Sequence, residues 1–214
     1  MIINHTYPDY ILARNRIGKS RYNGAFYYSK EICENMIPLI KTDRNWITVE
    51  LKTIGLDHSI VFVHNRLHPE WYDHYEKYND VIFVCSVKHM CEKLKHLGKT
   101  ILLPLSVDVE YVKQFRRKKD KDVAFVGRKA KLKEIPSVIP EGTDYVCGMP
   151  RDQLLSEMAR YRKVYAVDRV AIEAKILGCE VLPYEPNNME DVWEVLDNKD
   201  AAKILQRELE KIDG

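Results

Sequence analysis

Apolar residues lie along the chain in short unbroken runs, which alternate with segments whose apolar positions recur every three or four residues. A short unbroken run is typical of a strand buried on both faces, and the wider spacing is typical of a helix. The predicted strands are residues 1–3, 46–51, 60–63, 81–85, 100–105, 123–126, 144–147, 163–167 and 180–182. The predicted helices are residues 27–40, 69–78, 87–97, 151–161 and 170–177. This alternation predicts the α/β class, with parallel sheets covered by helices.

The segment 171–184, AIEAKILGCEVLPY, shows one such unit clearly. Ile172 and Ile176 fall on one helical face, and Gly178 suits the left-handed residue that ends many helices. Glu173 is predicted to lie in the first helical turn, where N–H groups attract anionic and hydroxyl-rich ligands. An ordinary helix–strand unit with a solvated glutamate is the alternative interpretation.

The alternation is interrupted by residues 113–122, which are rich in lysine and arginine and poor in apolar side chains. We interpret this segment as a basic linker between two α/β domains, residues 1–112 and residues 123–188, because the strand–helix pattern begins again after it. Residues 189–214 are acidic and amphipathic. They are predicted to form C-terminal helices that pack back towards the N-terminal half.

Composition places the chain among globular proteins and points to no particular partner. Of its 214 residues, 45% are hydrophobic and 31% are charged, and the formal net charge is +2. No apolar run approaches the ~18 residues that span a bilayer, and the N-terminal segment lacks the layout of a signal peptide. The five cysteines suggest no disulfide framework. These features predict a cytoplasmic protein without a membrane span.

A cluster of cations follows the predicted strand at 123–126. Gly127 is followed by Arg128, and Lys133 lies five residues further on. In open α/β sheets, ligands bind beyond the carboxyl ends of strands, and arginine and lysine at that edge suit a phosphate or diphosphate. A solvent-facing basic turn is the alternative. The chain contains no GxGxxG, no phosphate loop ending in Gly-Lys-Ser/Thr and no GxSxG.

The order of these features resembles that of the retaining nucleotide-sugar glycosyltransferases of GT-B fold. In that family a strand and helix similar to DVIFVCSVKHMCEKLKHLG lead to an asparagine-glycine-valine-aspartate turn, which here reads LSVD. A valine-glycine-arginine strand end comes next, then a helix similar to RDQLLSEMARY and a glutamate-alanine helix that ends in glycine. The similarity extends over residues 60–184, and Asn23 and Gly24 are similar to the family's glycine-rich loop. It implies a GT-B-like fold, with two Rossmann-like parallel-sheet domains facing a cleft.

The resemblance also implies a role for each matching residue. Gly127, Arg128 and Lys133 would bind the diphosphate of a nucleoside-diphosphate sugar, and the two cations would stabilise it as it leaves. Glu173 would accept hydrogen bonds from the ribose hydroxyls, and His64 would lie beside the transferred sugar. The implied enzyme transfers a sugar, retains its configuration and needs no tightly bound cofactor or metal.

The chain departs from the family pattern near the ribose glutamate. The family has a second acid eight residues earlier, and that position here is Tyr165; Asp168 lies close by and joins the donor-binding candidates. The family's glycine-phenylalanine-glycine loop is replaced by residues 167–169. The alternative function is therefore a non-catalytic relic of this fold that binds a nucleotide or nucleic acid.

The acceptor-side candidates are Arg21, Tyr22 and Gly24, in a segment where cations and aromatic residues are interleaved. Such interleaving suits a nucleic-acid strand or a flipped base, and some GT-B enzymes glycosylate modified DNA bases. A DNA-base-modifying glycosyltransferase is thus one alternative, and a saccharide, lipid-linked or protein acceptor is the default. Alternatively, this segment is a basic loop beside a core helix and has no role in binding an acceptor.

Overall fold

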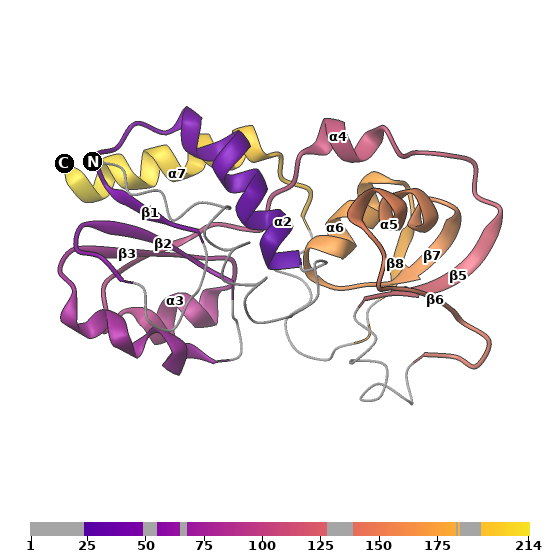
Figure 1. Ribbon diagram of the computed structural model, residues 1–214, viewed down its shortest axis with the longest axis horizontal. Coiled ribbons are helices and arrows are strands. Elements are labelled where there is room, and N and C mark those ends of the chain that lie inside the picture. The colour runs from indigo at the N-terminus through magenta and orange to yellow at the C-terminus, as the bar shows by residue number, and fades with distance from the viewer. Residues whose placement is uncertain (1–23, 49–54, 65–67, 128–138, 183, 185–193) are drawn as a thin grey trace. The chain divides into compact units, whose positions relative to one another are not determined.

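The computed structural model describes residues 24–48, 55–64, 68–127, 139–182, 184 and 194–214. The chain forms two compact units, one made of Met1–Pro104 with Asn198–Gly214 and the other of Leu105–Asp197. Each unit contains a four-stranded sheet whose paired strands are all parallel (Figure 1). The predicted α/β class with two Rossmann-like parallel sheets is confirmed.

The first sheet has the strand order β1-β2-β3-β4. Its strands are β1 (Asn45–Ile47), β2 (Ser59–Val63), β3 (Val81–Cys85) and β4 (Lys99–Leu102). Every residue of the two central strands is buried. This burial explains their unbroken apolar sequences, because each face of these strands is covered.

Helices cover both faces of the first sheet (Figure 1). They are α2 (Gly24–Glu31), the π-helical η1 (Ile32–Met36), the 3-10 helices η2 (Ile37–Leu39) and η3 (Pro69–Lys77), α3 (Lys88–Leu94) and α7 (Asn198–Asp213). The predicted helix 27–40 is therefore α2, η1 and η2 in succession. Helix α7 packs against η1 and η2, so the C-terminal segment returns to the first unit as expected.

The predicted helix 69–78 is a 3-10 helix, η3, and two of its tyrosines pack against the sheet. Tyr72 and Tyr75 are buried and stack with their ring centroids 6.5 Å apart. Both rings also meet Phe83 of β3 edge-on. The three-residue repeat of a 3-10 helix places both rings over the same strand residue.

A buried arginine joins three elements at the amino edge of the first sheet. Arg44 lies just before β1 and pairs with Asp80, which precedes β3, and with Asp213 at the end of α7. It also donates to the carbonyl oxygen of Asp80 at 3.1 Å. The contacts fix α7 to the starts of two strands through one guanidinium group.

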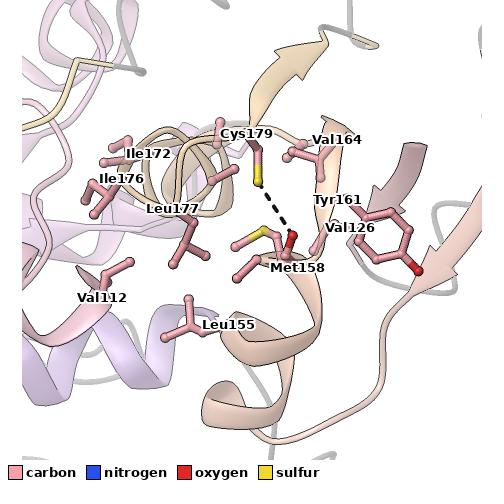
Figure 2. Packing of buried hydrophobic residues seen from close by; sticks show 14 of the residues in the cluster. Val112, Val126, Leu155, Met158, Tyr161, Val164, Ile172, Ile176, Leu177 and Cys179 are labelled. Carbon is pink, nitrogen blue, oxygen red and sulfur yellow. Dashed lines mark hydrogen bonds between the residues drawn. The ribbon is translucent and has the colours of Figure 1, made fainter. Parts of the chain in front are cut away.

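The second sheet has the strand order β6-β5-β7-β8. Its strands are β5 (Lys121–Val126), β6 (Asp144–Val146), β7 (Tyr161–Tyr165) and β8 (Glu180–Leu182). Helices α4 (Val109–Lys113), α5 (Arg151–Met158) and α6 (Asp168–Ile176) contribute to one hydrophobic core on one sheet face. Figure 2 shows Leu155 of α5 and Ile172 of α6 in this core. Phe125 alternates to the other face, where it packs with Ile139 and Tyr184.

The structure places the boundary differently from the predicted basic linker at 113–122. The second unit begins at Leu105, and Val112 is completely buried in its core (Figure 2). Arg116 donates through Nε to the carbonyl of Ile176 at 2.6 Å, and Lys119 donates to the carbonyl of Leu177 at 2.9 Å. These cations bind the C-terminal carbonyls of α6, where the helix dipole favours positive charge. The basic segment therefore belongs to the second unit.

Candidate functional site at the carboxyl edge of the second sheet

The strand order of the second sheet creates a topological switch point. From β5 the chain passes to β6 on one side, whereas from β7 it passes to β8 on the other side. Ligands of open α/β sheets bind outside the carboxyl ends of the strands where the direction reverses. The candidate site therefore lies at the carboxyl ends of β5 and β7, within the second unit.

Gly127 marks the end of β5 at this switch point. Its N–H donates to the carbonyl of Val146 at 3.4 Å, which continues the pairing with β6. An added Cβ would lie 2.9 Å from the ring of Phe125, so a larger residue requires that ring to move. Arg128 and Lys133 follow along the chain but lie outside the described residues, and the contacts of these two candidates stay predictions.

Asp168 follows β7 at the same edge and begins α6. Its φ of +57° lies in the left-handed region, which a residue other than glycine adopts rarely, aspartate among the more tolerant. Tyr165, the last residue of β7, packs with Phe125 and Tyr184 in the cluster on the opposite sheet face. The acid that the family places at this position is thus replaced by a packed aromatic ring.

The sequence predicted that Glu173 lies in the first turn of its helix, and the structure shows that it does not. It is the sixth residue of α6, and it is only 3% exposed. Two arginines contact the same carboxylate oxygen: Arg151 donates through Nη2 to Oε1 at 2.9 Å, and Arg169 donates through Nε to Oε1 at 3.0 Å. The electrostatic partners of Glu173 are therefore two full positive charges, and not the partial charge of a helix N-terminus that the sequence predicted.

The two arginines were missed by the sequence reasoning. Arg169 and Glu173 stand four residues apart, which is a spacing that predicts a helical ion pair once the helix is recognised. Arg151 gives no such signal, because it comes from the start of a different helix. Its guanidinium lies 5.1 Å from the ring centroid of Tyr111, whose hydroxyl donates to Asp152.

His64 lies in the first unit, directly after the carboxyl end of β2. Its Nε2 is 2.6 Å from the carbonyl oxygen of Thr48, so this nitrogen carries the proton and donates it. The ring meets Tyr28 edge-on at 5.4 Å. Burial lowers the pKa of His64 to about 4, and the ring is therefore neutral at pH 7.

Ser29 lies next to this histidine, but the geometry excludes an activated serine nucleophile. The Ser29 hydroxyl donates to the Thr48 carbonyl, which also accepts the proton of His64 Nε2. Ser29 Oγ and His64 Nε2 are 3.4 Å apart, and both groups use their proton on the same oxygen. A histidine that acts as general base must instead offer an unprotonated nitrogen to the hydroxyl.

The pKa values of two histidines of the first sheet, His58 and His64, should be shifted in opposite directions. Hydrogen bonds from Asp43 and then Asp80 raise the pKa of His58, which lies at the amino edge. We expect His64 to stay neutral down to about pH 4 and His58 to protonate above its ordinary value of about 6.5. Titration of the imidazole signals by NMR tests this order. A midpoint for His64 near 6.5 would contradict the described contacts.

The two shifts act on stability with opposite signs. The stabilisation from His58 is complete below about pH 6.5 and is lost as the pH rises through its raised pKa. His64 instead destabilises the folded state as the pH falls from about 6.5 to 4, by about 3 kcal/mol in all. A His64→Gln variant should therefore lose less stability than the unmodified protein over that interval.

The acceptor-side candidates are only partly described. Gly24 begins α2, whereas Arg21 and Tyr22 lie outside the described residues. A separate groove of about 470 Å³ lies on the second unit. It is lined by Lys121, Asp144, Tyr145, Val146, Met149, Gln153, Glu157 and Tyr161. Several of these residues start β5, β6 and β7, so this groove is not at the edge that holds the switch point.

Comparisons with known proteins add no family assignment. No protein-family model matches the sequence, and no curated protein matches it significantly. In the part of the chain that the structure describes, no group of three or more metal-ligating side chains could hold a metal ion. Among these residues there is also no helix with the length and apolarity needed to cross a membrane.

Proposed function

We propose that the protein is a nucleotide-sugar glycosyltransferase of the GT-B type. The donor's diphosphate binds at the carboxyl edge of the second sheet. The supporting observation is the switch point between β5 and β7, because Gly127 ends one of these strands and Asp168 follows the other. Arg128, the residue predicted to bind the phosphate, follows Gly127 directly in the sequence.

In this proposal cations supply the main catalytic effect. Arg128 and Lys133 bind the diphosphate and offset the negative charge that grows on it as the sugar leaves. Arginine can bind two phosphate oxygens at once, and lysine adds a point charge. The proposal includes no resident cofactor, because the two cations supply the charge that stabilises the leaving diphosphate.

His64, in the first unit, is neutral at pH 7 and therefore does not act as an acid in this proposal. The neutral ring is held in one tautomer by the Thr48 carbonyl, which fixes its orientation. With a pKa of about 4 it cannot serve as a general acid at pH 7.

A non-catalytic nucleotide-binding protein is the second candidate. Tyr165 favours it, because a packed aromatic ring stands where the family has an acid. The engagement of Glu173 with two arginines favours it too, since a ribose contact would need this carboxylate to change partners. The two candidates differ in whether the bound donor is broken down.

Donor hydrolysis separates these candidates. The protein is incubated with uridine, guanosine, adenosine and thymidine diphosphate sugars, and the released nucleoside diphosphate is measured. We expect slow release from at least one donor, and a loss of tenfold or more in Arg128→Ala, since one charge-assisted hydrogen bond contributes ~1.5–3 kcal/mol. Binding without release supports the non-catalytic candidate. If the protein shows no binding and no release with any donor, both candidates are contradicted.

A further inference from the structure

Arg151, Arg169 and Glu173 form a cluster of charged side chains in the second unit. Each of the three side chains is 9% exposed or less. Both guanidinium groups point at one oxygen, Glu173 Oε1, which brings two phosphate-binding side chains together at a single place.

This cluster lies at the edge where the proposed donor binds. Arg151 is the first residue of α5, which follows β6, and Arg169 is in the first turn of α6, which follows β7. The beginnings of both helices therefore belong to the carboxyl edge that Gly127 also marks. The guanidinium fork matches the oxygens of a phosphate as well as those of a carboxylate.

We infer that Arg151 and Arg169 bind the diphosphate of the donor, and that Glu173 is a positioning residue that holds both guanidinium groups before the ligand arrives. The inference rests on the proposed function. A diphosphate carries more negative charge than one carboxylate, so it competes with Glu173 for the same N–H groups. Glu173 thereby keeps the arginines in place and also weakens anion binding.

Inorganic pyrophosphate is the probe, because it carries the charge of the donor without base, ribose or sugar. Its affinity is measured by calorimetry at low ionic strength for the unmodified protein and for Arg151→Lys and Arg169→Lys. Lysine keeps the charge and removes the fork, and each variant should bind pyrophosphate at least tenfold more weakly. Arg160→Lys is the control, since Arg160 also contacts two carboxylates, Asp120 and Glu157, but lies just before the amino end of β7. Its affinity should change by less than twofold.

The variant Glu173→Gln tests the inference more strictly, because the inference predicts the direction of the change in pyrophosphate affinity. If the carboxylate competes with the ligand, this variant binds pyrophosphate severalfold more tightly. Unchanged pyrophosphate affinity, with a larger loss of affinity for a ribose nucleotide than for its 2′,3′-dideoxy form, would assign Glu173 to the ribose and overturn the inference. Unchanged affinity in both lysine variants would also overturn it. If a lysine variant does not fold, the direction of the Glu173→Gln effect decides.

These outcomes can be separated from failure of the proposed function. Pyrophosphate binding that depends on both arginines, without release from any nucleotide sugar, keeps the anion site and rejects glycosyl transfer. Donor hydrolysis that is unchanged in both lysine variants keeps glycosyl transfer and rejects the arginine pair.

Discussion

Replacing Glu173 with glutamine should lower the free energy of unfolding by about 3 kcal/mol, because it leaves two buried guanidinium groups without their shared negative charge. The family resemblance alone suggests a variant that folds normally, since a ligand-facing glutamate has no structural partner. The measurement is chemical denaturation at neutral pH. It is followed through the transition of the second unit, because the two units need not unfold together.

Glu157→Gln is the matched control for this prediction. Glu157 also pairs with two cations, Lys121 and Arg160, but its side chain is 28% exposed and theirs are 30% and 33% exposed. Solvent screens such pairs, so the loss should be about 1 kcal/mol or less. Equal losses in the two variants would show that burial does not set the strength of the Glu173 cluster.

Replacing Arg44 with methionine should destabilise the first unit by about 1.5–3 kcal/mol. The side chain is 3% exposed and pairs with Asp80 at 2.9 Å and with Asp213 at 2.5 Å. Methionine fills part of the volume and leaves both carboxylates without their cation, but these carboxylates are 39% and 42% exposed, so water offsets part of the loss. The docking of α7 on the sheet should loosen as well, which hydrogen exchange along α7 would detect.

Lys211→Met serves as the control for the Arg44 variant. Lys211 is on the same helix, α7, and pairs with Glu208, but its side chain is 69% exposed. An exposed pair one helical turn apart contributes about 0.5 kcal/mol or less. A similar loss in both variants, or no loss in Arg44→Met, would remove the structural role given to Arg44.

Sequence patterns predicted the strands well where both faces are buried. The run at 81–85 is apolar throughout and forms β3 with the predicted bounds. The boundary between α5 and β7 was less accurate. Tyr161 lies three residues after Met158, a helical spacing, yet it begins β7 opposite Lys121. The buried ring and its hydrogen bond to Asp144 decide its place, and tertiary contacts of this kind leave no mark on local periodicity.

The candidate site was predictable only in part, for a similar reason. Gly127 and Asp168 follow strands, so their position at the carboxyl edge could be inferred from the alternation of elements. Arg151 comes from a different helix than its partner Glu173, and only the packing of α5 beside α6 brings them together. The basic segment was misjudged because the carbonyls of α6 that bind Arg116 and Lys119 are about sixty residues away in sequence.

We propose that the carboxyl edge of the second sheet binds a nucleoside diphosphate through Arg128. Calorimetric titration of uridine, guanosine and adenosine diphosphates into the unmodified protein, Arg128→Ala and Lys129→Ala tests it most directly. We predict that one nucleotide binds the unmodified protein, that Arg128→Ala weakens this binding at least tenfold, and that Lys129→Ala changes it little. Equal affinities in the two variants, or no binding of any nucleotide to the unmodified protein, would contradict the claim.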